Sequence, residues 1–258
     1  MGTPPLVFIT GASSGIGQAL AARYAAAGWR LALAARRGAD MQAWAAAQGL
    51  GPGRCAVYGA DVAVTDSIVQ AAQDCIARQG LPDVVIACAG VSIGMDTAER
   101  SDLEVMREMF ALNNVGLAAT FHAFLRGMRE RRAGTLVGVA SVSAIRGLPG
   151  HGAYCASKAG VVAYCESLRV ECRGDGVRVV TLVPGYVATP LTAANPYRMP
   201  FLIRPEVFAE RAFHAIQAGR SYVVIPWPMA VVAKLLRMLP NGLYDRLLSG
   251  RGRKPRRG

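Results

Sequence analysis

With 258 residues, 52% of them hydrophobic, and 29 glycines, the chain is long enough for one well-buried α/β domain and shows neither a second domain nor internal repeats. Its formal net charge is +12, but aromatic and basic residues do not interleave, so we expect no specific nucleic-acid site. The six cysteines show neither Cys-x-x-Cys nor Cys/His ligand spacing, which argues against a metal site.

The chain begins with five residues, Met1 to Pro5, that lead directly into an apolar run. They have neither the charged start nor the apolar core of a signal peptide. We therefore expect a cytoplasmic protein whose cysteines are reduced.

The first apolar run leads into the glycine-rich loop Thr10–Gly17 and then into a helical pattern that stops at Gly28. Strand, glycine loop and helix in this order are typical of a phosphate-binding turn. Gly11 permits a tight turn, Gly15 lets the backbone approach a pyrophosphate, and Gly17 allows the helix to lie close to the strand. Because the start of a helix offers free N–H groups to phosphates, we predict cofactor contacts from Gly11, Ser13, Ser14, Gly15, Ile16 and Gly17.

Residues 30–35 predict the next strand, which ends at Arg36 and Arg37. In dinucleotide-binding folds that prefer NAD, this position carries a carboxylate for the ribose 2′-hydroxyl. A guanidinium can instead make bidentate, charge-assisted bonds to a 2′-phosphate. We therefore predict NADP(H) as the cofactor, with Arg36 the better candidate of the two. The alternative is that both arginines are solvated loop charges.

The rest of the chain alternates strands and helices. Strands are predicted at 55–60, 83–86, 135–140, 177–183 and 221–225, and helices at 65–79, from a capping box at 101–104 through Asn113 toward Arg129, and from about 154 to 173. This alternation predicts a doubly wound, Rossmann-type α/β fold with a parallel sheet and right-handed crossovers. A ligand is expected at the carboxyl ends of its strands.

Tyr154 and Lys158 are four residues apart on a predicted helix, and Ser141 ends the predicted strand upstream of them. Because an i, i+4 pair shares one helix face, the Lys158 charge can favour the phenolate and bring a pKa of about 10 toward neutrality. The spacing alone also suits a solvated helix face. Two neighbours are rival candidates: Ser143, which strand alternation disfavours, and His151, which we interpret as a solvated loop histidine near the substrate entrance.

These motifs together resemble the short-chain dehydrogenase/reductase family over about the first 190 residues. Thr10–Gly17 is similar to the family's T-G-x-x-x-G-x-G, Asn113 with Gly116 to its N-x-x-G, and Pro184–Thr189 to its P-G-x-V-x-T. The resemblance implies a sheet of about seven parallel strands between helices. It also implies that NAD(P)(H) and an alcohol or carbonyl substrate meet at Ser141, Tyr154 and Lys158.

The resemblance also implies roles for single residues. Tyr154 would be the acid/base, Ser141 would hold the substrate oxygen, Lys158 would anchor the nicotinamide ribose, and Asn113 would bend its helix and hold a water that links Lys158 to solvent. Other cofactor contacts implied in this way, besides Tyr154 and Lys158, are Asp61, Val62, Ala89, Gly90, Pro184, Gly185, Val187 and Thr189.

One departure from the family pattern follows the fourth predicted strand. Ala87 and Cys88 stand where the family usually has two asparagines before Ala-Gly. Their replacement removes polar ties, so we expect lower stability at this strand end and unchanged activity. We interpret Cys88 as a small buried hydrophobic residue; the alternative is a reactive thiol near the cofactor.

The family pattern does not account for the C-terminal part of the chain. We divide the protein into a Rossmann-type domain (1–226), a helical extension (227–250) and a basic, disordered tail (251–258). The apolar run at 229–239 is too short to span a bilayer, which needs about 20 residues. It can serve as a lid, as a subunit interface in a homodimer or homotetramer, or, less favoured, as a peripheral membrane contact through 227–258.

The sequence therefore predicts an NADP(H)-dependent oxidoreductase that interconverts a ketone or aldehyde with an alcohol. The apolar loop at 190–201 and the C-terminal helices favour a small hydrophobic substrate. The alternative is a non-catalytic NADP(H)-binding sensor or scaffold that associates with a membrane or a protein partner.

Overall fold

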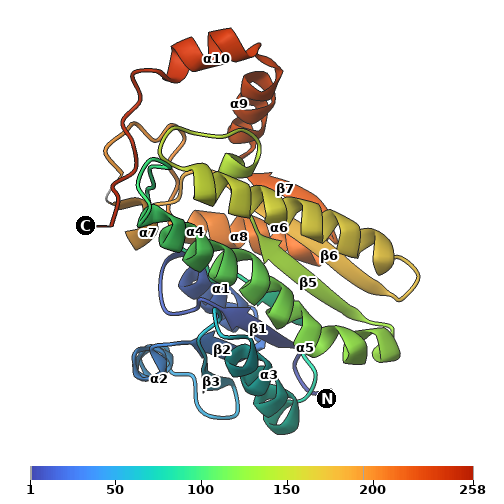
Figure 1. Cartoon of the computed structure of the whole chain (residues 1–258). Coiled ribbons are helices and arrows are strands. Elements are labelled where there is room, and N and C mark those ends of the chain that lie inside the picture. The colour runs from blue at the N-terminus through green and yellow to red at the C-terminus, as the bar shows by residue number, and fades with distance from the viewer. Residues whose placement is uncertain (1, 194, 258) are drawn as a thin grey trace.

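A computed structural model describes residues 2–193 and 195–257. A seven-stranded parallel sheet lies between two layers of helices (Figure 1), in the order β3-β2-β1-β4-β5-β6-β7. The strands are β1 (Leu6–Thr10), β2 (Arg30–Ala35), β3 (Cys55–Gly59), β4 (Val84–Ala87), β5 (Gly134–Val139), β6 (Val177–Pro184) and β7 (Tyr222–Ile225). The doubly wound α/β fold predicted from the sequence is confirmed.

The helices form in the connections between the strands and beyond the last strand. They are α1 (Gly15–Ala26), α2 (Gly38–Ala47), α3 (Thr65–Gln79), α4 (Asp102–Phe110), α5 (Gly116–Arg131), α6 (Gly152–Glu171), α7 (Pro190–Ala193), α8 (Pro205–Gln217), α9 (Trp227–Met238) and α10 (Asn241–Leu248). The sequence analysis did not predict α2 or α8. Alanine fills much of α2, so its apolar periodicity is weak. In α8 the signal was present, since Pro205 opens a helix whose buried side recurs at Phe208 and Ala212.

The hydrophobic core has one layer on each face of the sheet. Residues of β1 alternate between them: Phe8 packs with α3, α5 and α6, whereas Val7 and Ile9 pack with α1, α2 and α8. All five residues of β1 are therefore buried. This explains why the strand is a continuous apolar run rather than an alternating one.

The predicted long helix toward Arg129 forms, with a π-helical turn at Ala111–Val115 between α4 and α5. The capping box predicted at its start is wrong, because the Ser101 side chain makes no capping hydrogen bond. The neighbouring Asp102 carboxylate has other partners. It accepts the Asp96 N–H at 2.7 Å and pairs with the Arg256 guanidinium at 2.7 Å.

The C-terminal part of the chain leaves the sheet after β7 and later returns to the body of the molecule. Helices α9 and α10 stand at one end of the molecule, and the chain then runs back toward α4 and α7 (Figure 1). Residues 251–257, which we call the C-terminal strap, make ion pairs with Asp96, Asp102 and Glu108. The structure thus differs from the expected disordered tail, because the fold brings acidic side chains to the arginines; Gly258 lies outside the described residues. Among the described residues, no helix is long and apolar enough to cross a membrane.

Candidate active site

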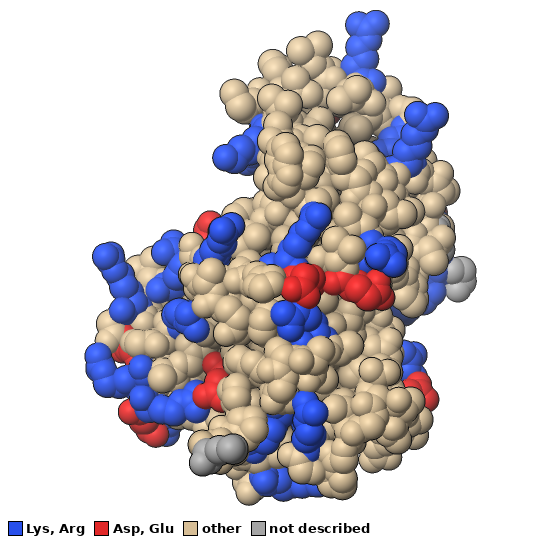
Figure 2. Space-filling view, turned by 180° about the vertical axis from the view of Figure 1, so that it is seen from behind, with Lys and Arg blue, Asp and Glu red and all other residues tan. Residues whose placement is uncertain are grey.

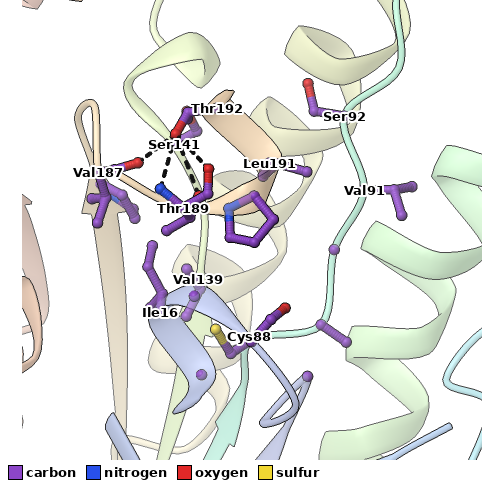
Figure 3. Close-up of a pocket in the computed structure, with 18 of the residues that line it drawn as sticks. Ile16, Cys88, Val91, Ser92, Val139, Ser141, Val187, Thr189, Leu191 and Thr192 are labelled. Atoms are coloured by element: carbon purple, nitrogen blue, oxygen red, sulfur yellow. Dashed lines mark hydrogen bonds between the residues drawn. The ribbon is translucent and has the colours of Figure 1, made fainter. Parts of the chain in front are cut away.

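A cavity of about 650 Å³ lies at the carboxyl ends of the strands. The structure brings together around it every residue that the sequence analysis assigned to the cofactor or to catalysis, except Asn113. Thr189 and Val187, from the loop after β6, are held in its wall by the Thr192 hydroxyl, which accepts the Thr189 N–H at 3.1 Å and donates to the Val187 carbonyl at 2.7 Å (Figure 3). The residues lie where the prediction needs them; their roles toward a cofactor remain predictions.

The glycine turn between β1 and α1 is closely packed. Gly11 and Gly15 have φ of +69° and +55°, which favour glycine. A Cβ atom on Gly11 would lie 2.7 Å from the Ala89 Cα, and one on Gly17 would overlap the Gly11 carbonyl oxygen. Ser14 precedes α1 without making a side-chain capping bond, so the first N–H groups of the helix remain available to an anion. This turn fits a dinucleotide pyrophosphate.

The ends of β2 and β3 form the side of the cavity that would hold the adenosine. Arg37 is engaged, since its guanidinium contacts the Ser13 hydroxyl at 3.3 Å and pairs with Asp40 at 3.0 Å. Arg36 is exposed and has no ion pair or side-chain hydrogen bond among residues 2–193 and 195–257. Asp61 is fixed at the end of β3 by its Oδ1, which accepts the Ala63 N–H at 3.0 Å. At this side of the cavity, Arg36 is therefore a cation without a partner in the described part of the chain.

The three predicted catalytic residues come from two adjacent elements. Ser141 lies two residues after the end of β5, and its Oγ accepts the Ser143 N–H at 3.2 Å. Tyr154 and Lys158 lie on successive turns of α6 and line the same cavity. The Lys158 ammonium donates to the Val139 carbonyl at 2.8 Å and lies 6.0 Å from the centre of the Tyr154 ring. The trio is assembled around the cavity, and the rival Ser143 also lines it.

Burial governs the protonation of this site. Desolvation raises the pKa of Tyr154 to about 12, although the Ser141 hydroxyl opposes the shift, and it lowers the pKa of Lys158 to about 8. In the protein by itself, burial moves the pKa of Tyr154 away from neutrality, contrary to the expected effect of Lys158, whose ammonium bonds a backbone carbonyl instead. Near neutral pH, Tyr154 is therefore a phenol with a proton to donate.

Asn113 lies behind the cavity, in the π-helical turn. Its amide donates to the Ser157 hydroxyl at 2.9 Å and to the Val91 carbonyl at 3.1 Å, and its Oδ1 accepts the Val91 N–H at 2.9 Å. A Cβ atom on Gly90 would lie 3.2 Å from Asn113 Oδ1 and 3.3 Å from Lys158 Nζ, so both atoms face one small space. Asn113 therefore joins α6 to the loop after β4, and its water-holding role remains an expectation.

The backbone that follows β4 is held by Thr10. Its buried hydroxyl accepts the Cys88 N–H at 3.1 Å and the Ala89 N–H at 3.2 Å. Burial raises the pKa of the Cys88 thiol to about 12, so a thiolate is not formed near neutral pH. Cys88 is thus unreactive as a thiolate, as the hydrophobic interpretation expects, but it is only partly buried and lines the cavity.

His151 corrects the sequence interpretation. It is only 4% exposed, not solvated, and its Nε2 lies 3.1 Å from the Tyr197 hydroxyl. Burial, followed by the charges of Lys254 and Arg251, lowers its pKa to about 4. The sequence analysis also missed Lys254, which lines the cavity. No local pattern could have placed it there, because about a hundred residues separate it from Tyr154.

Comparisons with known proteins agree with this geometry. The family model described as short chain dehydrogenase matches residues 5–198. The chain is a member of the short-chain dehydrogenase/reductase family. This short-chain dehydrogenase is 41% identical to an uncharacterized oxidoreductase of Myxococcus xanthus, over 92% of this chain and 93% of that protein. It is 31% identical to dehydrogenase/reductase SDR family member 7B of Bos taurus, over 98% and 82%.

A solved structure extends the comparison to three dimensions. The alcohol dehydrogenase of the archaeon Thermococcus sibiricus, complexed with 5-hydroxy-NADP, superposes on this short-chain dehydrogenase with a TM-score of 0.77 and 27% identity. The alignment covers 86% of this chain and 95% of that one. The fold and the family are thus established by independent comparisons.

The buried, neutral His151 makes stability depend on pH. Its folded pKa, about 4, lies below the ordinary value of 6.5, so between these values only the unfolded chain binds the proton and stability falls as the pH falls. From pH 7 to pH 5, we expect the free energy of unfolding of the wild type to fall by about 2 kcal/mol relative to His151→Gln. Urea denaturation at both pH values measures this difference. His122→Gln, an exposed histidine of α5, should follow the wild type, and equal pH dependence of all three proteins would contradict the prediction.

Proposed function

We propose that the protein is an NADP(H)-dependent oxidoreductase that interconverts a ketone or aldehyde with an alcohol. The observation that carries the proposal is that Ser141, Tyr154 and Lys158 line the same cavity as the glycine turn. A proton donor and a phosphate-binding turn on one cavity suit hydride transfer with a dinucleotide.

The residues of the chain supply everything but the hydride, which bound NADPH supplies. In the reductive direction Tyr154 donates its proton to the carbonyl oxygen, and the Ser141 hydroxyl bonds the same oxygen and orients it. Lys158, with its pKa lowered to about 8, is mostly cationic near neutral pH. It would bond the nicotinamide ribose and favour the tyrosinate that the oxidative direction needs.

The choice of NADP(H) rests on Arg36. An exposed guanidinium with no partner in the described part of the chain is available to the 2′-phosphate, whereas Arg37 is already paired with Asp40. No carboxylate stands at the end of β2, where an NAD-preferring fold would place one.

The second candidate function is a non-catalytic NADP(H)-binding sensor or scaffold. It would need the cofactor site but neither the Tyr154 proton nor the Ser141 hydroxyl. Because both side chains line the cavity, we favour the enzyme. The cytoplasmic location and the homodimer or homotetramer expected from the sequence remain predictions.

We further propose that α9 and α10 contact an anionic lipid surface. Each has a buried side, with Met229 and Ala233 on α9 and Tyr244 on α10. The opposite side is apolar and exposed: Trp227, Val231, Leu235, Met238, Leu243 and Leu247. Of the C-terminal segment, the strap contributes a residue to the cavity wall, and the lid and subunit-interface roles expected for these helices remain predictions.

The basic residues beside this apolar surface favour an anionic lipid layer as its partner. Lys234 and Arg237 on α9 and Arg246 on α10 are exposed beside it, and Asp245 is the one acidic residue of the two helices. In the space-filling view, this end of the molecule is largely uncharged with basic side chains standing out from it (Figure 2). Apolar side chains and a tryptophan among cations are typical of peripheral helices at a lipid headgroup layer.

Replacing Tyr154 by Phe tests the catalytic assignment. The variant should bind NADPH as the wild type does, but its turnover should fall by about a hundredfold or more, because the proton donor is lost. A panel of aldehydes and ketones, followed at the NADPH absorbance, measures turnover, and NADPH fluorescence measures binding. Unchanged turnover in the variant would sink the assignment. Binding of NADPH with no turnover of any carbonyl by the wild type would favour the sensor.

Replacing Arg36 by Ala tests the cofactor choice. Removing one charge-assisted contact to the 2′-phosphate should lower kcat/KM for NADPH by about tenfold to a hundredfold and leave kcat/KM for NADH unchanged. Arg37→Ala is the matched comparison and should lose less, because that guanidinium already binds Ser13 and Asp40. A wild type that prefers NADH would overturn the proposal.

Flotation with vesicles tests the lipid contact. The wild type should float with vesicles that contain phosphatidylserine and remain behind with phosphatidylcholine alone, and the double variant Leu235→Glu, Met238→Glu should not float. Val170→Glu, at an equally exposed apolar position on α6, is the control and should float. If instead the wild type ignores vesicles and the double variant converts a dimer to a monomer on size exclusion, the surface is a subunit interface.

A further inference from the structure

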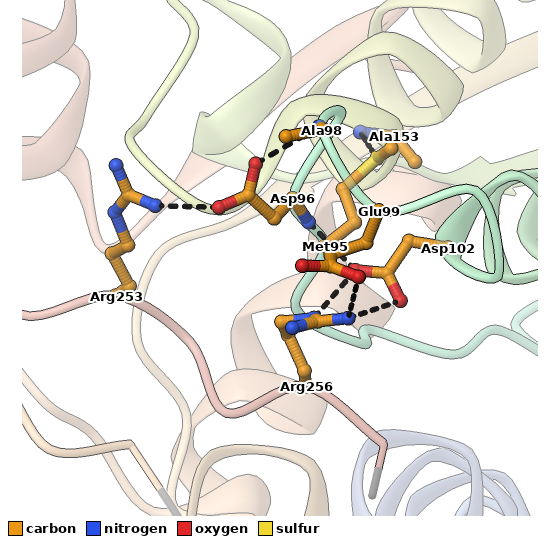
Figure 4. Close-up of polar contacts among 8 residues, drawn as sticks. All are labelled: Met95, Asp96, Ala98, Glu99, Asp102, Ala153, Arg253 and Arg256. Atoms are coloured by element: carbon orange, nitrogen blue, oxygen red, sulfur yellow. Dashed lines mark hydrogen bonds and ion pairs between the residues drawn. The ribbon is translucent and has the colours of Figure 1, made fainter.

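The C-terminal strap is held beside the cavity by ion pairs. Arg253 pairs with Asp96 at 3.1 Å, Arg256 with the buried Asp102 at 2.7 Å and with Glu99 at 3.8 Å, and Arg257 with Glu108 at 2.6 Å. Figure 4 shows the first two arginines reaching the loop before α4 from the strap. Three arginines with acidic partners fasten the segment on both sides of residue 254.

Backbone contacts add to this attachment. The Gly94 N–H donates to the Pro255 carbonyl at 3.0 Å, and Gly94 and Arg256 form a parallel bridge. A Cβ atom on Gly94 would overlap the Lys254 carbonyl oxygen, so the close approach needs glycine there. The strap therefore packs closely against the loop that contains Gly94.

Lys254 differs from the arginines around it. Its side chain turns into the molecule and is 8% exposed, and its ammonium donates to the Leu191 carbonyl at 2.9 Å and to Asn195 Oδ1 at 2.7 Å. Both acceptors are neutral. No carboxylate among residues 2–193 and 195–257 pairs with it, although every other cation of the strap except Arg251 has one.

A buried ammonium without a counter-ion is unfavourable, because desolvation is not repaid by an opposite charge. Desolvation alone lowers the pKa of Lys254. The two hydrogen bonds use two of its three N–H donors. One N–H donor and the positive charge of Lys254 are therefore left without a partner. Lys254 lines the same cavity as Tyr154.

The surroundings of Lys254 contain a second unpartnered polar group. His151 lines the same cavity and has no hydrogen-bond partner for its buried Nδ1 in the described part of the chain. Lys254 lies near enough to lower the pKa of His151. The imidazole beside it is neutral, so the Lys254 ammonium is left as the charged donor in this part of the cavity, which suits a carboxylate or sulfonate.

We propose that Lys254 is a specificity-determining residue, and that the carbonyl substrate bears an anionic group, a carboxylate or a sulfonate, that pairs with its ammonium. The proposal rests on the proposed carbonyl reduction and refines the expected hydrophobic substrate. The apolar side chains of Leu148 and Leu191 would line the body of the substrate between Tyr154 and Lys254. The strap would thus complete the substrate site as well as cover it.

Matched pairs of substrates test the proposal. Succinic semialdehyde and para-carboxybenzaldehyde are each compared with the corresponding neutral methyl ester, with NADPH as the reductant. We expect the wild type to favour the anion by about tenfold to a hundredfold in kcat/KM. In Lys254→Met and Lys254→Gln, the ratio of kcat/KM for the acid to kcat/KM for its ester should fall to about one. The Gln variant retains a donor for Leu191, which separates loss of charge from loosening of the loop.

Two further measurements complete the test. Arg198 is an exposed cation in the loop at 190–201, which also contains Leu191, and it does not line the cavity. Arg198→Met should therefore keep the preference for the anion. Benzoate, compared with benzamide, should raise the Tm of the wild type in the presence of NADP⁺ but not that of Lys254→Met, and this readout needs no turnover.

The possible outcomes separate the two proposals. Equal use of acids and esters by the wild type, or a preference that survives in both Lys254 variants, overturns the role of Lys254 and leaves carbonyl reduction standing. If no carbonyl of either kind is reduced, the proposed function fails, and the benzoate shift decides by itself whether Lys254 binds an anion.

Discussion

Burial of a parallel sheet on both faces is the constraint on which the rest of this structure depends. Because helices cover both sides, each strand must be followed by a crossover, and all carboxyl ends meet at one edge. The order of the strands reverses between β1 and β4, which opens a crevice there. Segments as distant as the turn at Gly11, the serine after β5 and the loop after β6 therefore line one cavity. Residues from separate connections are thus brought to one site by the topology of the sheet.

Within that cavity, desolvation is the dominant electrostatic effect. It keeps the proton on Tyr154, weakens the hold of Lys158 on its proton, and keeps His151 neutral. The two lysines of the cavity, Lys158 and Lys254, both bond backbone carbonyls and have no carboxylate partner among the described residues. A site that holds buried cations with only neutral acceptors is suited to ligands that bring negative charge. A dinucleotide phosphate and an anionic substrate group both meet this condition.

The C-terminal segment divides into two parts with different physical characters. Helices α9 and α10 bury one side against the body, where Met229 packs on Gly185 and Arg146 stacks on Tyr244, and they leave an apolar side exposed. The C-terminal strap has no apolar side chain to bury apart from Pro255, and it is held by arginine pairs instead. A single ion pair at the surface contributes little to stability. The Asp102 carboxylate differs because it is buried and accepts hydrogen bonds from the Asp96 N–H and from Arg256.

The sequence by itself was sufficient for the local features of this protein. These features are the strand, glycine turn and helix at residues 6–26, the arginines after β2, and the Tyr154–Lys158 spacing. Each is a short-range pattern that depends on interactions within a few residues, and the structure contains each of them. Only the tertiary structure could show that His151 is buried, that Thr10 binds the backbone after β4, and that Lys254 reaches the cavity. Each of these depends on desolvation or on a partner distant in sequence. Burial and long-range charge pairing are properties of the folded chain, so no local pattern of residues carries them.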